Sequence, residues 1–213
     1  MNRNLAAVVR PGRAGGPPVI DVSALAPGAF GHRSILFWGT AGLCLIEGVA
    51  FVLAIAAYFY IRLRNETWPP NVMPPLLQWG TLNTIILLAS GVPNQITRMA
   101  AERVDLAKVR VWLVVCLLFG VAFNIVRVFE FASLNVLWSD NAYGSIVWLL
   151  LGLHTTHIVT DVLDTGVLTL LMLTGPIEEK RFVDVSENAM YWYFVVLTWL
   201  PIYGVIYWAP RLT

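Results

Sequence analysis

The chain has 213 residues, of which 58% are hydrophobic and 13% are charged, and its formal net charge is +1. Soluble domains are about 45–50% apolar and about 25% charged, so this composition excludes a soluble globule, a disordered chain and a disulfide scaffold. No basic cluster is dense enough for a nucleic-acid-binding surface. An integral membrane protein remains.

Residues 1–33 form an N-terminal segment that is rich in proline and glycine. Such a composition disfavours both helix and packed core, so we expect an irregular arm. The apolar stretch Leu5–Val9 is too short for a secretory signal and is followed by Arg10 and Pro11. The remaining residues, 34–213, are predicted to form one transmembrane domain.

Five long apolar segments follow the arm, and each reaches the roughly 20 residues that a helix needs to cross the hydrocarbon core. They are Ile35–Ile61, Leu76–Met99, Val109–Phe131, Tyr143–Leu173 and Ala189–Trp208. Lipid offers no partners to unpaired backbone groups, so each segment should be helical. We therefore predict an all-α fold, an integral membrane bundle of five transmembrane helices, with kinks at Pro93 and Pro201.

The positions of lysine and arginine predict the orientation of the bundle. Ten of these residues lie on the side of the N-terminal arm, whereas three lie on the opposite side. Because positive charge is enriched in cytoplasmic segments, we expect a cytoplasmic N-terminus and an external C-terminus.

Glu47 lies close to the middle of the first predicted span. An ionisable group at the bilayer centre costs roughly 2.5–3.5 kcal/mol on insertion scales, so it should face the bundle interior. Two roles fit this position: a carboxylate that accepts a proton or contacts lipid, or a protonated carboxyl that hydrogen-bonds a neighbouring helix.

Four polar residues share one face of the fourth span: His154, His157, Asp161 and Asp164. Their spacings of three, four and three residues place them within a stripe about 80° wide. A proton relay, a metal site and an interhelical hydrogen-bond network all fit this stripe, but a single haem does not, because the two histidines cannot reach opposite faces of one iron. We expect the four side chains to face the interior and to reach Glu47 or Glu130.

Two further sites involve carboxylates. Arg127 and Glu130 are three residues apart in the third span, which allows an ion pair on one helix face. Glu187 precedes the fifth span, where it would cap that helix or meet the end of the fourth. The sequence contains no nucleophile–base pair, phosphate-binding loop or paired cysteine motif, so no catalytic residue is predicted.

Five segments, in order, resemble subunit III of the haem–copper oxidases, the cytochrome c and quinol oxidase family. Glu47 lies in LIEGVAFVLAIAAYFY at the place of the family's membrane-buried glutamate, and VFEF places Glu130 at its glutamate–aromatic position. His154 and His157 are the paired histidines of YGSIVWLLLGLHTTHIV. The other two segments are PPLLQWGTLNTIILLASG and YWYFVVLTWLPIYGVIYW.

This resemblance implies a short, five-helix bacterial subunit III in the cytoplasmic (inner) membrane, with subunit I as its main contact and subunit II as a further partner. It implies no cofactor or metal in this chain, haem and copper in the partner catalytic subunits, bound phospholipid, and support of proton uptake.

The family's last helix reads Trp-His-Phe-Val-Asp, whereas Tyr193 and Val196 replace the histidine and aspartate here. Asp161 and Asp164 are additional carboxylates, which indicates a rewired polar network.

Two alternatives remain open at this point. One is an accessory subunit of nitric oxide reductase, a relative with a similar five-helix plan. The other is an independent membrane protein that moves protons or metal ions by means of Glu47 and the polar stripe.

Overall fold

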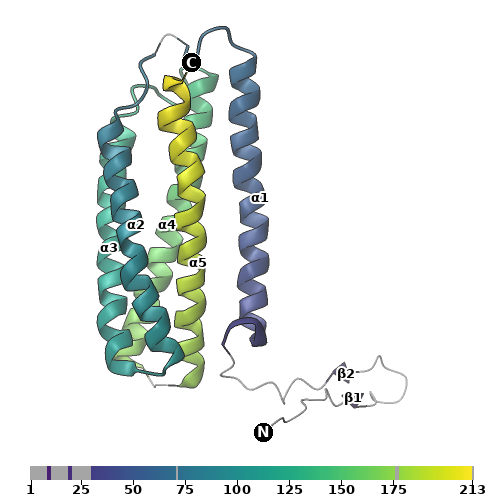
Figure 1. The fold of residues 1–213 in the computed structure, drawn as a ribbon, viewed down its shortest axis with the longest axis vertical. Helices are drawn as coiled ribbons and strands as arrows, with labels where there is room; N and C mark the ends of the chain where they lie inside the picture. Colours follow the sequence, from purple (N-terminus) through teal and green to yellow (C-terminus); the bar gives the residue numbers. More distant parts are fainter. Residues whose placement is uncertain (1–8, 11–18, 21–29, 71, 176–177, 213) are drawn as a thin grey trace.

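The structure is a computed structural model that describes residues 9–10, 19–20, 30–70, 72–175 and 178–212. Five long helices dominate it (Figure 1). They are α1 (Ile35–Leu63), α2 (Leu77–Glu102), α3 (Leu106–Ala132), α4 (Ala142–Thr174) and α5 (Glu179–Tyr203). The all-α bundle of five helices predicted from the sequence is thereby confirmed.

Part of the N-terminal arm is described. It contains two antiparallel strands of two residues each, β1 (Val9–Arg10) and β2 (Val19–Ile20), and a single 3₁₀ turn, η1 (Gly31–Arg33). The rest of the predicted irregular arm lies outside the described residues.

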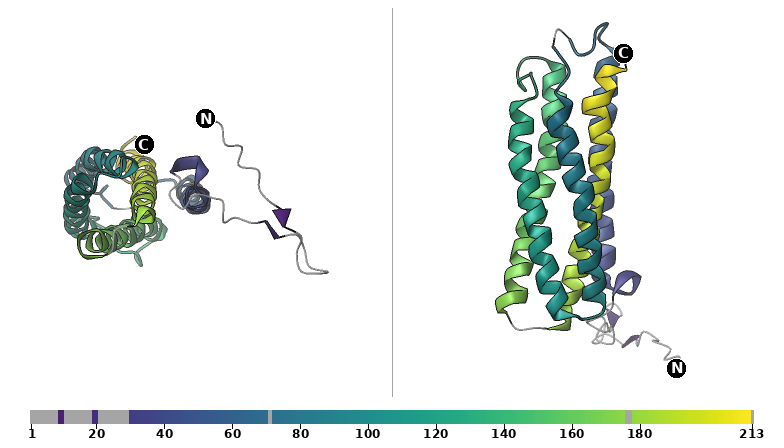
Figure 2. Two further views of the ribbon diagram at one scale, coloured as in Figure 1. Left: turned by 90° about the horizontal axis from the view of Figure 1, so that it is seen from below. Right: turned by 60° about the vertical axis from the view of Figure 1, so that its left-hand side comes forward.

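Four of the helices form a ring, and α1 stands outside it. In the ring α2 packs on α3, α3 on α4, α4 on α5, and α5 back on α2, as the left view of Figure 2 shows. Successive helices run in opposite directions, which short connections between neighbours favour. α1 packs mainly along the edge that α4 and α5 share, so within the described part of the chain its outer face has no helical partner.

Four helices are long and apolar enough to cross a membrane: α1, α3, α4 and the continuous segment 180–211 that contains α5. α2 has the same length but is less apolar, because its inner face carries polar side chains such as Asn83, Ser90 and Asn94. It lies alongside α3 and α5 (Figure 1), so its polar face is turned into the bundle rather than to lipid.

Local signals in the sequence determine where the helices begin. Ser34, Asp105 and Asn141 are the N-cap residues of α1, α3 and α4, and the side chain of each accepts a backbone N–H of the first turn, as N-cap residues do. Asp105 lies outside the spans, and its hydrogen bond and ion pair with Lys108 lower the pKa of its carboxyl group.

The start of α5 differs from the sequence prediction. The helix begins at Glu179, ten residues before the expected Ala189, because the charged stretch before Ala189 is interspersed with Phe182, Val183 and Val185, whose burial makes this segment part of the helix. Glu187 is therefore an interior helical residue, and the expected capping role is wrong. Pro201 lies inside α5, and three residues later the chain changes to a π-helical turn, η2 (Gly204–Trp208).

α3 and α4 approach closely at Gly120. A Cβ atom built on Gly120 would collide with Cγ2 of Val162, a branched side chain on α4. Stiff β-branched side chains have little room to move away, so the absence of a side chain at position 120 determines how near the two helices lie.

We predict that Gly120→Ala lowers the stability of the bundle by about 1–3 kcal/mol through overpacking. Adding Val162→Ala should recover most of the loss, because it removes the colliding methyl groups. Thermal aggregation of the purified chain or complex in detergent measures the effect. Gly42→Ala is the matched control, since its Cβ would meet nothing within 4 Å; equal losses in both glycine variants would contradict the close-packing explanation.

Candidate functional site

The bundle interior contains a buried ion pair on α3. Nη1 of Arg127 lies 2.9 Å from Oε2 of Glu130, and both side chains are at most 1% exposed. Nε of Arg127 makes no hydrogen bond, and Nη1 makes none beyond this ion pair. The guanidinium also lies over the rings of Phe123 and Trp199, at 4.6 and 4.2 Å from their centroids, and such cation–π contacts stabilise a desolvated cation.

Glu130 is held by donors from two other parts of the chain. The amide of Asn83 on α2 donates to Oε2 at 2.5 Å, and the hydroxyl of Tyr207 in η2 donates to Oε1 at 2.6 Å. Gly80 makes room for the ring of Tyr207, because a Cβ at that position would collide with it. One carboxylate thus joins α2, α3 and the end of the chain.

His154 on α4 extends this network with both ring nitrogens engaged. Nη2 of Arg127 lies 3.2 Å from Nδ1, and Nε2 lies 3.0 Å from the carbonyl oxygen of Val195 on α5. Arginine can only donate and a carbonyl can only accept, so His154 carries its proton on Nε2. Neither nitrogen is free to bind a metal or haem iron.

Glu47 forms the second polar cluster, between α1 and the ring. The Tyr191 hydroxyl on α5 donates to its Oε2 at 2.8 Å, and Nε2 of His157 on α4 lies 3.6 Å from the same oxygen. Nδ1 of His157 lies 2.6 Å from the Leu153 carbonyl and must therefore carry a proton. Glu47 is 22% exposed and His157 12%, so this cluster lies at the bundle surface whereas the first is fully enclosed.

The two aspartates of the stripe meet α5. Asn188 donates through its amide to Oδ1 of Asp161 and Oδ2 of Asp164, both at 3.2 Å. The hydroxyl of Thr165 donates to Oδ1 of Asn188 at 3.2 Å. Asp161 is buried, whereas Asp164 is exposed at the rim.

The four polar residues of the stripe on α4 therefore contact three different side chains: Glu47, Arg127 and Asn188. His157 reaches Glu47, as the sequence suggested, and His154 reaches Glu130 only through Arg127. Asp161 and Asp164 reach neither glutamate. The expected ion pair between Arg127 and Glu130 is present.

Residues that carry no charge complete these clusters, and the sequence interpretation missed them. They are Asn83, Asn188, Tyr191 and Tyr207. Their signal was available, because hydrogen-bonding side chains within apolar spans need partners just as charges do.

The clusters can hold protons and organise hydrogen bonds. Within the described part of the chain, no group of three or more His, Cys, Asp or Glu residues could hold a metal ion. Glu47, Glu130, Asp161 and Asp164 instead accept from amide or hydroxyl donors, and the two histidines bond to Arg127 or to backbone carbonyls.

Comparisons with known proteins agree in pointing to one family. The family model described as cytochrome c oxidase subunit III matches residues 31–210. The chain is 28% identical over 180 residues to cytochrome c oxidase subunit 3 of Drosophila yakuba; the matched region covers 81% of this chain and 69% of that protein. It is 24% identical over 177 residues to cytochrome c oxidase subunit 3 of Thermostichus vulcanus, a match that covers 83% of this chain and 88% of the relative. It is 29% identical over 181 residues to a probable cytochrome c oxidase subunit 3 of Mycobacterium tuberculosis, a match that covers 81% of this chain and 84% of the relative.

Removal of one partner from the buried ion pair should be costly. We expect Glu130→Gln to destabilise the chain by about 3–5 kcal/mol, because it leaves the Arg127 guanidinium buried without a counter-charge. The double variant Arg127→Met with Glu130→Gln should be more stable than the single one. The matched control is Glu102→Gln, which breaks the exposed pair with Arg98 and should cost less than about 1 kcal/mol. Thermal denaturation in detergent ranks the variants, and a double variant no better than Glu130→Gln would refute the charge argument.

The two histidines of α4 should differ in tautomer. Solid-state NMR of ¹⁵N-histidine-labelled protein in bilayers should show a protonated Nε2 and a bare Nδ1 for His154, and a protonated Nδ1 for His157. His154→Asn and His157→Asn variants assign the signals. A protonated Nδ1 on His154 is incompatible with its contact to Arg127.

Proposed function

Since the chain belongs to the cytochrome c oxidase subunit III family and is a subunit III of a terminal oxidase, we propose that it serves there as a non-redox subunit. In this role it packs beside the catalytic subunit, stabilises it during turnover, binds lipid and supports proton uptake. Haem and copper belong to the partner subunits in this proposal.

The observation that carries the proposal is the closed hydrogen-bond network around Glu130. Its histidine is engaged at both ring nitrogens, and its cation contacts the faces of two aromatic rings. Such a network fixes helices relative to one another and leaves no ligand atom for a redox centre. A rigid membrane scaffold is what a subunit without its own chemistry would supply.

Lipid binding and proton uptake are proposed for the surface of the bundle rather than its centre. Glu47 is partly exposed beside His157 and Tyr191, and it lines a cavity that carries further carboxylates. Carboxylates at the mouth of a membrane protein raise the local concentration of protons. This supports a role in delivering protons to the neighbouring catalytic subunit.

The placement in the cell follows the same proposal. We place the chain in the bacterial cytoplasmic membrane with subunit I as its main contact and subunit II nearby. The excess of lysine and arginine at the end where α1 begins supports a cytoplasmic N-terminus and a periplasmic C-terminus.

Isolation of the complex through a tag on this chain tests the proposal. We expect haem and copper in the purified complex, together with oxygen consumption. Selective removal of the chain should leave the haem spectrum and the initial rate unchanged but shorten the active lifetime, because no redox centre leaves with it.

Three results would contradict the proposal. Loss of haem or copper in proportion to the chain would assign it a redox role. Haem and iron without copper, with nitric oxide consumption, would place it with the reductases. Recovery of the chain alone would favour an independent transporter.

A further inference from the structure

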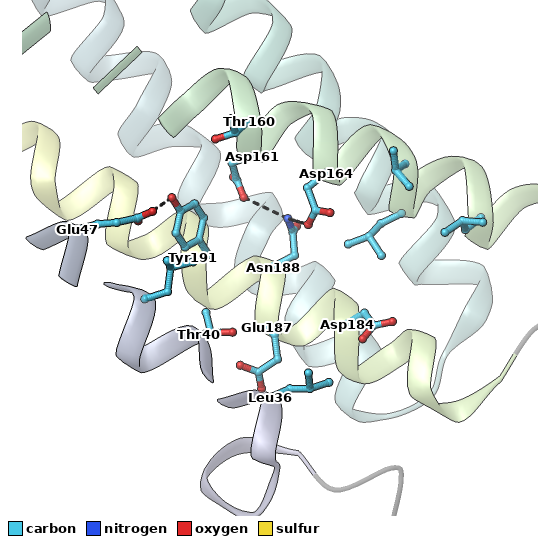
Figure 3. A pocket seen from close by; sticks show the side chains of 14 residues that line it. Leu36, Thr40, Glu47, Thr160, Asp161, Asp164, Asp184, Glu187, Asn188 and Tyr191 are labelled. Carbon is cyan, nitrogen blue, oxygen red and sulfur yellow. Dashed lines mark hydrogen bonds between the residues drawn. The ribbon is translucent and has the colours of Figure 1, made fainter. Parts of the chain in front are cut away.

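An elongated cavity of 550 Å³ lies between α1 and the edge that α4 and α5 form. Figure 3 shows its lining residues, among them Leu36 and Glu47 of α1, near its two ends. These positions are eleven residues apart, which corresponds to about 16 Å along a helix. The cavity therefore extends from the end of the bundle where α1 begins to the Glu47 cluster.

Carboxylates from all three helices line this cavity. Glu47 comes from α1, Asp161 and Asp164 from α4, and Asp184 and Glu187 from α5. None of the described lining residues is lysine, arginine or histidine. Lys180, Arg181 and Arg98 act on Asp184 or Glu187 from a distance but do not line the cavity. Its described lining thus carries five acidic side chains and no basic one.

Two of the carboxylates are buried with an oxygen that has no partner. Asp161 is 3% exposed and Glu187 is 7% exposed, and neither Oδ2 of Asp161 nor Oε2 of Glu187 accepts a hydrogen bond. A buried acceptor without a donor is costly. Protonation alone does not resolve this, since it would turn an unpaired acceptor into an unpaired donor. Both side chains line the cavity, and the described chain supplies no donor to these two oxygens.

The negative charge is distributed along the cavity rather than gathered at one point. Glu47 bonds to Tyr191, which lies about 10 Å from Asp184 along α5, and the described residues contain no three-ligand cluster for a metal ion. The wall between the carboxylates is apolar, with Leu43, Val167 and Leu168 among the lining residues. Distributed acceptors alternating with aliphatic walls match a molecule with several ammonium groups joined by methylene chains.

We propose that this cavity binds a linear aliphatic diamine or polyamine, which enters at the end of the bundle where α1 begins. Its ammonium groups donate to Asp161, Glu187 and their neighbours, and its methylene chains pack on the leucine and valine side chains. An aminophospholipid headgroup fits less well, because its phosphate would follow the ammonium into a lining that already carries five carboxylates. The site shares Glu47 and the other cavity carboxylates with the proton-uptake role proposed above, but binding of an amine does not depend on that role.

Equilibrium dialysis of labelled spermidine, a linear triamine, tests the proposal. The tagged complex is placed in nanodiscs of phosphatidylcholine at physiological ionic strength, so that weak surface attraction is screened. We expect saturable binding that the double variant Asp161→Asn with Glu187→Gln weakens at least tenfold. The matched control Glu102→Gln removes a carboxylate at the same end of the bundle but outside the cavity, and should bind as the unaltered chain does.

Two further arms keep the test decisive if the double variant does not assemble. Thr40→Phe blocks the cavity from α1 without removing a carboxylate and should also abolish binding. Butylamine, a monoamine, should bind at least tenfold more weakly than spermidine to the unaltered complex. No saturable binding, equal affinity for butylamine, or loss of binding in Glu102→Gln would overturn the proposal. Native mass spectrometry that shows a retained aminophospholipid, lost in the double variant and not displaced by spermidine, would overturn it in favour of the lipid headgroup.

Discussion

The ion pair between Arg127 and Glu130 is the constraint on which the four-helix ring depends. Neither charge can remain unpaired away from water, so each must keep its partners in place. Glu130 accepts from Asn83 and Tyr207, and Arg127 contacts His154. Because these partners belong to α2, η2 and α4, a shift of any one of these elements would leave a charged or polar group unsatisfied. The pair therefore fixes the positions of these helices along one another, which apolar packing alone would determine less strictly.

α1 lies outside this network, and its position explains the cavity. Among the described contacts, Glu47 is the residue of α1 whose side chain bonds to α5 and approaches α4. The acidic cavity of Figure 3 lies between α1 and the edge of α4 and α5, over the stretch of α1 from Leu36 to Glu47. The contacts of Glu47 with Tyr191 and His157 hold the middle of α1 against the ring, at one end of this cavity.

The sequence predicts the helices well because length and apolar character decide them in lipid. It also predicts the Arg127–Glu130 pair, since three-residue spacing determines a contact within one helix. It does not predict the division of the stripe. His154 and Asp164 are ten residues, or about 15 Å, apart along α4, so they meet different neighbours even though they share a face. Those neighbours, Val195 and Asn188, depend on the register of α5 against α4, which a single sequence does not define.

The register of α5 against α4 also shows how the polar interior differs where the last helix departs from the family's pattern. Val196, which stands where the resembling family has an aspartate, is buried in the apolar core, and Tyr193 bonds to Gln95 instead. Asp161 and Asp164 meet Asn188, eight residues earlier on α5 and therefore about 12 Å nearer the end of the bundle where α1 begins. The carboxylates of α4 thus do not refill the space near Val196. They place carboxylates in the gap beside α1, whose described lining contains no lysine, arginine or histidine, and this is the basis for proposing a ligand that brings its own positive charge.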